Sequence, residues 1–467
     1  MSSLLARGLA PRMGPLPRRP VTVAALDIGS SKIACMIARL TPRDGSDGMR
    51  GRTHAVELLG FGHTSARGIK GGTVADMARA EEAVRRAVDA AERMAKVEIA
   101  SALVSVSGGR LGSESFAASV RLQGAAVEQS DIGRVLDAAS LHSVRDVALA
   151  SEASGQRDRA NMRAPDTRPG AGSSARARAV LHSLPIGYAL DGSPGIRDPR
   201  GMIGQVLAVD LHVVTADWPA LKNLVLLVER CHLSVEGLVA APYAAALSSL
   251  TADEAELGAV CIDFGAGTTT VAVFAGGHCV HADGVAIGGQ NLTTDLARAL
   301  STRVSEAERL KSLFGNVIAT ASDDVDMITV PAIEDERELP NAVPRSQIVR
   351  TIRPRIEEIV EFVRDRIAAA GMVTEARRRL VLTGGAAQLP GLAEFVGRAF
   401  GGAARIGRPI GIARMPDAAR LPGFAAAAGL LVFPQVAARE HFEPRRRAAE
   451  NEGNYLVRVG RWFKESF

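Results

Sequence analysis

The sequence has few cysteines, few aromatic residues and no long apolar run. Its 467 residues include four cysteines that form no C-x-x-C pair, which favours buried reduced thiols over a metal site or a disulfide framework. Aromatic residues make up 4% of the chain and do not alternate with the basic ones, so we expect no nucleic-acid partner. No apolar run reaches the ~18 residues of a transmembrane helix, so we expect none.

The length and composition of the chain indicate a globular protein of several domains. A chain of 467 residues is too long for one core, and 47% hydrophobic with 23% charged residues excludes general disorder. Residues 1–20 carry four arginines, four prolines and no acidic residue. Their apolar stretch is too short and interrupted for a secretory signal, so we expect a disordered tail.

One sequence motif occurs twice, at positions more than two hundred residues apart. Residues 23–34 read VAALDIGSSKIA, and residues 260–273 read VCIDFGAGTTTVAV. In each, an apolar run ends in an aspartate, a turn of glycine and hydroxyl residues follows, and a second apolar run returns. This pattern predicts a β-hairpin whose turn brings backbone N–H groups close to an anion, with the aspartate placed to order a metal ion.

A third glycine motif differs from the first two. Residues 380–392 read LVLTGGAAQLPGL, which predicts a buried strand, a turn at Gly384-Gly385 and a following helix. Such a turn suits a nucleoside that packs flat on the backbone. Any one glycine turn is weak support for a ligand site, since most hold none, but three in this order favour a nucleotide site over ordinary turns.

With these three motifs in this order and at these intervals, the chain resembles the actin-like ATPase superfamily and, within it, the FtsA family of bacterial cell division. The resemblance implies an α/β, two-domain actin-like fold in which an α+β subdomain, 1C, replaces 1B. It implies ATP and Mg²⁺ as ligands, with the ion held through water by Asp27 and Asp263. The residues expected around the nucleotide are Asp27, Gly29, Ser30, Ser31, Lys32, Asp263, Gly265, Gly267, Thr268, Thr269, Gly288, Gly289, Glu308, Lys311, Gly384, Gly385 and Ala386.

Some of these residues also have an ordinary structural interpretation. Glu308 and Lys311 match a family segment that edges the adenosine, but a charged helix surface would look the same. Ala266 stands where relatives have glycine, and we expect it to cost about 1 kcal/mol if its φ is positive. Thr270 replaces an acid of many relatives.

Hydrolysis requires a residue that positions the attacking water. In this superfamily it comes from the connection between the domains, which here reads LVAAPYAAAL and holds no Gln, Glu, Asp or His. We therefore expect slow turnover at best, and leave open whether the protein acts as an enzyme.

The resemblance implies this order of domains. We expect the tail at 1–20, subdomain 1A at 21–97, 217–240 and 416–433, 1C at 98–216, 2A at 241–300 and 371–415, 2B at 301–370, and a polar linker at 434–453. Within them we predict a helix at 131–141, one long strand or a strand pair at 201–215, and a helix at 346–369 that is broken near Pro354.

Residues 147–178 break the family pattern. They are rich in Ala, Ser, Arg and Gly, have no periodicity and fall where relatives have a short turn. We interpret them as a disordered insertion, with partner docking as the alternative.

Residues 454–467, NYLVRVGRWFKESF, form an amphipathic pattern after the linker. The apolar face of the expected helix holds Leu456, Val459, Trp462, Phe463 and Phe467, and the basic face holds Arg458, Arg461 and Lys464. Trp in the headgroup region and basic residues on anionic lipid predict a helix that lies on a membrane. The alternative is a terminal helix that packs on the protein itself.

By resemblance, the protein tethers the ring of the tubulin-like FtsZ to the cytoplasmic face of the inner membrane at the division site. The FtsZ tail would dock on 2B, where Arg345 and Arg355 lie on the matching helix. The protein would polymerise with copies of itself and recruit later division proteins through 1C. A pilus-assembly platform, a rod-shape filament and a sugar or acetate kinase of the same fold are the alternatives.

Overall fold

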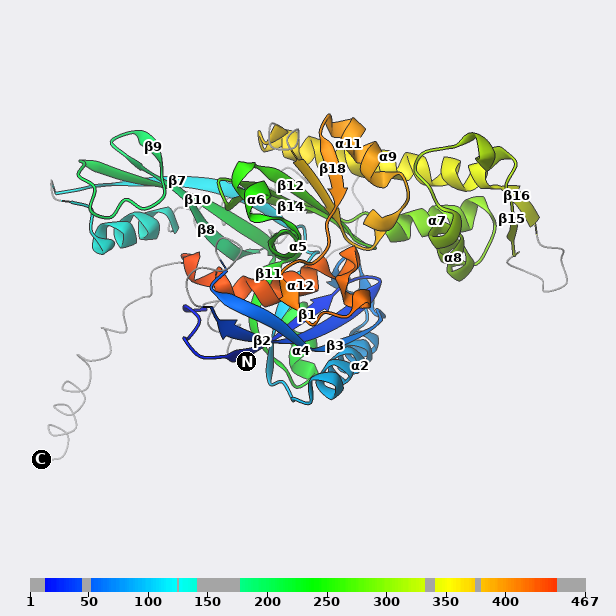
Figure 1. The fold of residues 1–467 in the computed structure, drawn as a ribbon, viewed down its shortest axis with the longest axis horizontal. Helices are drawn as coiled ribbons and strands as arrows, with labels where there is room; N and C mark the ends of the chain where they lie inside the picture. The colour runs from blue at the N-terminus through cyan, green and yellow to red at the C-terminus, as the bar shows by residue number, and fades with distance from the viewer. Residues whose placement is uncertain are drawn as a thin grey trace, which may run out of the picture.

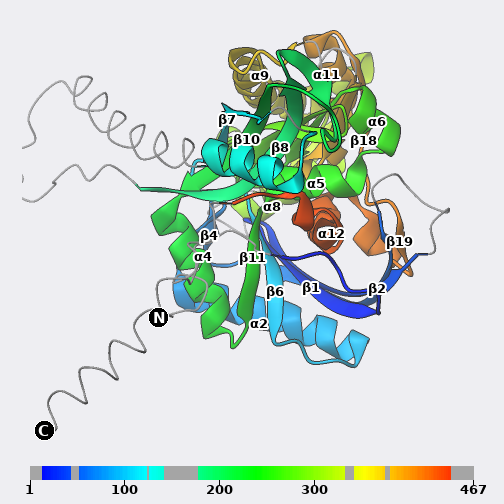
Figure 2. The same cartoon turned by 90° about the vertical axis from the view of Figure 1, so that its left-hand side faces the viewer.

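The computed structural model describes residues 13–43, 52–123, 126–140, 177–331, 341–373 and 379–442. Figure 1 shows two β-sheet halves stacked on each other, with a small subdomain extending from each end of the upper half. The view in Figure 2 places helices α5 and α12 between the halves.

The first half is built on a six-stranded sheet in the order β11-β6-β1-β2-β3-β19. Its antiparallel part contains β1, β2 and β3, and its parallel neighbours are β6 and β11. The elements of this half are β1 Val21–Ile28, β2 Lys32–Pro42, β3 His54–Ser65, β4 Ile69–Lys70, β5 Thr73–Val74, α2 Met77–Ala95, β6 Ser101–Val106, α4 Trp218–Arg230, β11 Ser234–Ala240 and β19 Ile412–Ala413. The predicted first hairpin is confirmed here.

Helix α2 lies unusually close to this sheet. Asp76 caps its first turn by accepting a hydrogen bond from Arg79 N, and its buried face is mostly alanine. A Cβ atom added at Gly60 or Gly62 of β3 would lie 2.2 or 2.1 Å from a backbone oxygen of α2. Small residues on both sides therefore allow this contact.

The second half repeats the strand order of the first. Its sheet runs β14-β13-β12-β17-β18, with β12 and β13 forming the second predicted hairpin. Strand β17 lies parallel to β12, and β18 lies parallel to β17. The elements are α6 Ala252–Leu257, β12 Ala259–Phe264, β13 Thr269–Ala275, β14 His278–Val285, α7 Gly289–Ala299, β17 Arg379–Thr383, η2 Ala386–Gln388, α11 Leu392–Phe400 and β18 Ala403–Ile406.

The subdomain at one end is a separate four-stranded sheet in the order β7-β10-β8-β9, with a helix over residues 129–140. Its strands are β7 Gly112–Arg121, β8 Arg178–Leu190, β9 Ser193–Ile196 and β10 Val206–Asp217. Two predictions need correction. The strand expected at 201–215 begins at Val206, and the insertion expected to run to 178 ends earlier, because Arg178 already pairs with Asp217 in the sheet.

The subdomain at the other end contains a β-ribbon and a long helix. Its elements are α8 Val304–Phe314, η1 Ala321–Asp324, β15 Met327–Val330, β16 Asn341–Pro344 and α9 Arg345–Ala369. The predicted break near Pro354 is wrong, since α9 continues through it. An interior proline costs about 3 kcal/mol, but α9 buries a row of Ile and Val side chains whose burial stabilises by about 1.5–3 kcal/mol each.

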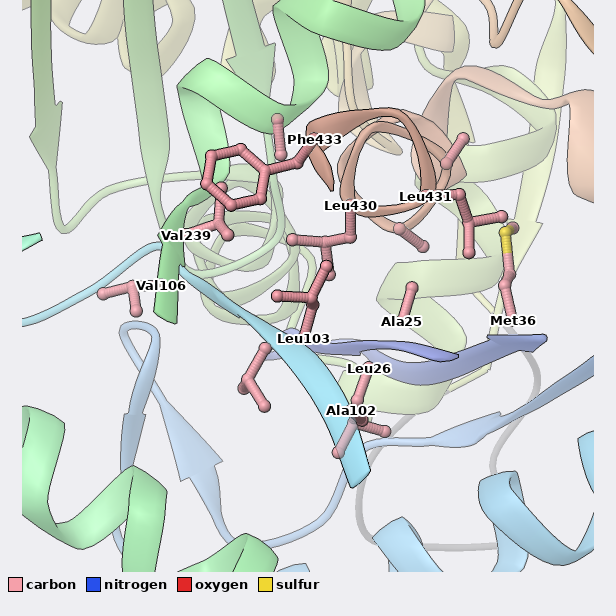
Figure 3. Close-up of a cluster of buried hydrophobic side chains, with 14 of the residues drawn as sticks. Ala25, Leu26, Met36, Ala102, Leu103, Val106, Val239, Leu430, Leu431 and Phe433 are labelled. Atoms are coloured by element: carbon pink, nitrogen blue, oxygen red, sulfur yellow. The ribbon is translucent and has the colours of Figure 1, made fainter. Parts of the chain in front are cut away.

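Two short helices join the halves. Helix α5 Ala241–Ser249 and helix α12 Ala425–Val432 pack so closely that a Cβ atom added at Gly429 would lie 1.7 Å from Ala244 O. Figure 3 shows Leu430, Leu431 and Phe433 above Leu103 and Met36 of the first sheet. The remaining turns in this region are η3 Asp417–Arg420, η4 Pro422–Phe424, η5 Phe433–Gln435 and η6 Ala437–Arg439.

Three predicted boundaries differ from the structure. Residues 13–20 are not a free tail, because Met13 and Leu16 pack against the first core. Strand β19, placed in 2A by the sequence, pairs with β3 of the first sheet. The linker predicted from 434 begins later, because Ala437 is buried.

Other predictions fall on residues that the structure does not describe. These are the tail before residue 13, most of the 147–178 insertion, and the segment from 443 onward, including the amphipathic pattern at 454–467. Among the described helices, none is long and apolar enough to cross a membrane.

Candidate nucleotide site

The first hairpin presents Asp27 at the inner end of β1. Ser105 Oγ at the end of the neighbouring β6 donates a hydrogen bond to Asp27 Oδ1 at 2.5 Å. The turn closes with a bond from Gly29 N to Lys32 O at 3.1 Å. Gly72 N donates to Ser30 Oγ at 3.1 Å, which fixes the serine at the turn.

The second hairpin presents Asp263 at the equivalent place in β12, opposite Thr270 of β13. Thr269 Oγ1 donates to Ile287 O at 2.8 Å, so this hydroxyl holds the turn and does not face a ligand. Gly289 N donates to Gly265 O and Gln290 N donates to Ala266 O, at 2.9 and 2.8 Å. The loop before α7 therefore supports the turn from behind.

The third motif closes over Asp263. Gly384 has φ +89°, and a Cβ atom there would lie 2.3 Å from Asp263 Oδ1, so only glycine fits. Gly384 N and Thr383 Oγ1 both donate to Pro422 O, at 3.1 and 2.9 Å. The segment that returns to the first half thereby anchors a turn of the second.

All three turns meet at one cavity of about 190 Å³. A Cβ atom at Gly267 of the second turn would lie 2.4 Å from Ser30 Oγ of the first, so the two hairpins touch. The residues lining the cavity are Asp27, Gly29, Ser30, Ser31, Lys32, Ser107, Ala241, Asp263, Gly265, Ala266, Gly267, Thr268, Glu308, Gly384, Gly385, Ala386, Pro422, Gly423 and Ala426. The cavity thus collects residues from both halves.

The charges of the cavity are unbalanced without a ligand. Burial raises the pKa of Asp27, against the opposing effects of Ser105 and Lys32. Burial and then the charge of Asp27 raise the pKa of Asp263 to about 7. Burial lowers the pKa of Lys32 despite both carboxylates. Two aspartates therefore share one lysine, and a cation would relieve their repulsion.

The donor set fits Mg²⁺ only if a ligand completes it. Asp27 and Asp263 offer carboxylate oxygens, which this ion prefers. In the described part of the chain, no group of three or more His, Cys, Asp or Glu side chains is arranged to hold a metal by itself. The remaining ligands would have to be phosphate oxygens and water.

Lys32 is held in place by the returning segment. Its Nζ atom lies 4.7 Å from the centroid of the Phe424 ring. A Cβ atom at Gly423 would lie 2.7 Å from the same Nζ, so the glycine leaves room for the ammonium group. The position of this charge therefore depends on the segment before α12.

Thirteen of the predicted nucleotide residues line the cavity, and four do not: Thr269, Gly288, Gly289 and Lys311. Lys311 Nζ donates to Gly289 O at 3.0 Å, to Thr293 Oγ1 at 2.8 Å and to Glu308 Oε2 at 2.7 Å. It therefore joins α8 to α7 behind the site.

Several lining residues were missed by the sequence interpretation: Ser107, Ala241, Pro422, Gly423 and Ala426. Ser107-Gly108 directly follows a buried strand, which is a usable signal. The alanines carry no chemical signal, since they only contact a ligand once the helices are placed. The strain expected at Ala266 is absent, because its φ is not positive.

A second cavity of about 660 Å³ adjoins the first and shares Ser107 and Thr268 with it. Its three arginines are each paired with a carboxylate. Arg110 and Arg178 contact Asp217, and Arg366 contacts Asp283. Because Arg110 and Arg178 share one carboxylate, these pairs balance two of the three arginine charges at this cavity.

The two arginines predicted to bind FtsZ are both engaged within the protein. Arg345 Nε donates to Phe314 O at 3.1 Å and lies 3.5 Å from Asp323. Arg355 Nε donates to Asp295 Oδ2 at 2.7 Å. They lie on α9, about 2.8 helical turns apart by sequence spacing.

Comparison with known proteins agrees with this architecture. Residues 260–429 match the family described as "Cell division protein FtsA", and residues 171–215 match "SHS2 domain inserted in FTSA". A chain of the PilM-PilN type IV pilus biogenesis complex has a similar fold, with a TM-score of 0.56 at 15% identity over 90% of this chain and 99% of that one.

Two relatives cover nearly the whole length. The chain is 48% identical over 461 residues to the cell division protein FtsA of Rhizobium meliloti (strain 1021), covering 98% of each. It is 30% identical over 453 residues to that of Escherichia coli (strain K12), covering 95% of this chain and 98% of the relative. The chain therefore belongs to the FtsA family of cell division proteins.

Proposed function

We propose that this protein binds ATP with Mg²⁺ in the cavity between the two hairpins and uses it as a slow conformational switch. The observation that carries the proposal is the convergence of two aspartate-glycine turns on one cavity, with Lys32 between the carboxylates. A triphosphate would lie between the turns, where glycine backbones leave room for it. Bound Mg²⁺ would neutralise phosphate charge.

The roles of the side chains follow from their positions. Asp27 and Asp263 would hold the ion through water, and Lys32 would place a point charge at the terminal phosphates. The Ala386 turn and Glu308 would border the adenosine, since both line the same cavity.

We expect slow hydrolysis of ATP because an alanine lies at the junction of β11 and α5. Ala241 lines the cavity there with a methyl group, which cannot orient water. Binding and release of nucleotide would then change the relative position of the halves more often than hydrolysis does.

In cell division, we propose that the protein anchors FtsZ polymers to the cytoplasmic face of the inner membrane at the division site. Residues 454–467 would lie on anionic lipid. The protein would form actin-like polymers with itself, and the 1C sheet would recruit later division proteins. A partner carboxylate that docks on α9 would compete with Asp323 and Asp295 for Arg345 and Arg355.

Binding of a non-hydrolysable ATP analogue by the full chain, with and without Mg²⁺, tests the nucleotide site. We expect Asp27→Asn or Asp263→Asn to abolish Mg²⁺-dependent binding. The exposed Asp89→Asn on α2 is the matched control and should bind normally. Equal binding by all three variants would refute the site, and rapid steady-state phosphate release would refute the slow switch.

Co-sedimentation with FtsZ and liposomes tests the tether. The full chain should carry FtsZ down with anionic liposomes but not with neutral ones, and a chain ending at Gly453 should not. Trp462→Glu should release the protein from the lipid, because it places a charge on the apolar face. Unchanged sedimentation of the shortened chain would locate the anchor elsewhere.

A further inference from the structure

The segment that follows α12 packs across three parts of the molecule. The Phe433 ring lies 5.7 Å from that of His182 and 6.2 Å from that of Tyr243, measured between centroids. Gln435 Oε1 accepts a hydrogen bond from His54 N at 2.9 Å. Residues 433–441, which we call the clasp, therefore fix the point from which the chain continues to its C-terminal tail.

The clasp contains a buried hydrogen bond between a carboxylate and a histidine ring. Glu440 Oε1 lies 2.9 Å from His182 Nδ1, and both side chains are fully buried. His182 belongs to β8 of the 1C sheet and lies 258 positions away in the sequence. Burial raises the pKa of Glu440, and the neighbouring His182 opposes that effect.

The other nitrogen of His182 reaches the connection between the halves. Ala240 N donates to His182 Nε2 at 2.9 Å, so Nε2 carries no proton, and the ring proton lies on Nδ1 and is donated to Glu440. The next residue, Ala241, lines the nucleotide cavity. A continuous chain of contacts thus runs from Glu440 to the cavity wall.

Two further contacts tie the clasp to 1C. His441 Nε2 lies 2.9 Å from Asp137 Oδ1 on the 129–140 helix, and His441 N donates to Ser183 O at 2.9 Å. At its other end the clasp continues α12, whose Ala426 also lines the cavity. Both ends of the clasp are therefore connected to moving parts of the proposed switch.

The Glu440 carboxylate is incompletely satisfied. Among the described residues, none donates a hydrogen bond to Glu440 Oε2, although that atom is buried. A buried carboxylate oxygen without a donor weakens the contact. This is therefore the contact of the clasp that we expect movements of its neighbours to disturb most easily.

We propose that the clasp couples nucleotide occupancy of the cavity to release of the C-terminal tail from the body of the protein. The inference rests on the proposed nucleotide site but not on the membrane role of the tail. Nucleotide that fixes Ala241 and Ala426 would keep His182 aligned with Glu440, and the empty cavity would loosen the clasp. By linkage, loosening the clasp must weaken nucleotide binding by the same factor.

Hydrogen exchange of the full chain, read on peptides covering 433–442, tests the coupling with a non-hydrolysable ATP analogue and Mg²⁺. We expect nucleotide to slow exchange there by about fivefold or more, the lower range of measured couplings. Unchanged exchange in a protein that binds the nucleotide would overturn the clasp and leave the nucleotide site intact. Absence of binding would overturn both.

Variants of Glu440 sharpen the test. Glu440→Leu removes the acceptor and should weaken nucleotide binding by about fivefold or more, while Glu440→Gln retains an acceptor for Nδ1–H and should lose less. The exposed neighbour Arg439→Ala is the matched control and should match the wild type. If Glu440→Leu does not fold, Glu440→Gln still decides the question, because it should bind nucleotide less tightly than Arg439→Ala. Equal affinity in all variants overturns the proposal.

Discussion

The two halves of the molecule share one strand order and differ in what is inserted into it. In each sheet the hairpin has one antiparallel neighbour on one side and two parallel strands on the other. The order β3-β2-β1-β6-β11 therefore corresponds to β14-β13-β12-β17-β18. The first half carries the 1C sheet between β6 and α4. The second carries its subdomain earlier, between α7 and β17.

The inserted parts also differ in how they are stabilised. The distal 1C sheet and its helix have a hydrophobic core of their own, around Leu207 and Val135. The α9 subdomain instead shares one core with the second sheet, since Ile352 and Ile356 pack in the same cluster as Ile262 of β12. The comparison indicates that 1C can change partly independently, whereas the α9 region cannot.

The turns differ at one equivalent position. Five residues after its aspartate, the first turn has Lys32, while the second has Thr268. One half therefore contributes a charge and the other a hydroxyl to the same cavity.

The largest expected effect comes from comparing the two cores. Ile356→Ala and Leu207→Ala each remove a fully buried side chain and should lower local stability by about 2–5 kcal/mol. Hydrogen exchange should show that Ile356→Ala exposes the β12–β13 hairpin, while Leu207→Ala loosens only the 1C strands. Equal loss of protection at β12–β13 in both variants would contradict the separate 1C core.

The junction between the halves should tolerate no added methyl group. Gly429→Ala forces a Cβ atom against Ala244 O and should lower the free energy of unfolding by about 1–3 kcal/mol or more. Gly133→Ala is the control, because that helical glycine has nothing within 4 Å of the added atom, and it should stabilise by about 0.5–1 kcal/mol. Urea unfolding measures both, and a tolerant Gly429 would mean that the helices can separate.

The unequal turns should contribute unequally to nucleotide affinity. Lys32→Met removes a charge-assisted contact and should weaken binding of an ATP analogue by about tenfold to a hundredfold. Thr268→Val removes a neutral hydroxyl and should cost about tenfold or less. Calorimetric titration compares them, and a larger loss for Thr268→Val would reverse the proposed roles.

The raised pKa of Asp263 predicts a pH dependence of nucleotide binding. Mg²⁺ requires the ionised carboxylate, so Mg²⁺-dependent affinity should rise with pH and level off above about 7. Below that value it should fall by up to about tenfold per pH unit. Titrations between pH 5.5 and 8.5, roughly 1.5 units on either side of that pKa, measure this, and any Mg²⁺-independent binding left in Asp263→Asn should show no such slope.

Asp263 should give the stability of the ligand-free protein the opposite pH dependence, with stability falling as pH rises. Because its folded pKa lies above its ordinary value, the contribution of Asp263 to stability is present at low pH and is lost as pH rises through about 7. Thermal unfolding without nucleotide should show this loss, and Asp263→Asn should reduce it. A wild-type profile that matches that variant would indicate an ordinary carboxylate.

The smallest expected effect concerns the insertion. Deleting residues 147–176 should leave the melting temperature within a few degrees, because long loops cost little entropy. Extending the deletion through Arg178 should lower it further, since this side chain donates to Thr215 Oγ1 at 2.8 Å. A large loss from the shorter deletion would show that the insertion packs on the protein.

Much of the site followed from local pattern. Both hairpins, the Gly384-Gly385 turn and a helix after it were predicted, and the actin-like fold is confirmed by family membership. Each of these elements has an alternation or a turn residue that acts within a few positions. The roles of the lining residues as nucleotide ligands remain predictions.

Elements that depend on distant partners were missed. Strand β8 contains Pro185 and Gly187, which weaken a strand signal, yet its pairing with β10 holds it in place. Helix α9 continues through Pro354 because its buried face packs in the second core. In both cases tertiary contacts outweigh a local preference.

The sequence by itself determined the two turns, their aspartates and the family to which the chain belongs, because the chemistry of each turn is contained in about five consecutive residues. Only the tertiary structure decided that the polar stretch at 434–441 is not a linker. The side chain of Glu440 in this stretch is buried against His182, which belongs to another subdomain. No pattern within either segment encodes that contact, since burial of a charge depends on what the fold places opposite it.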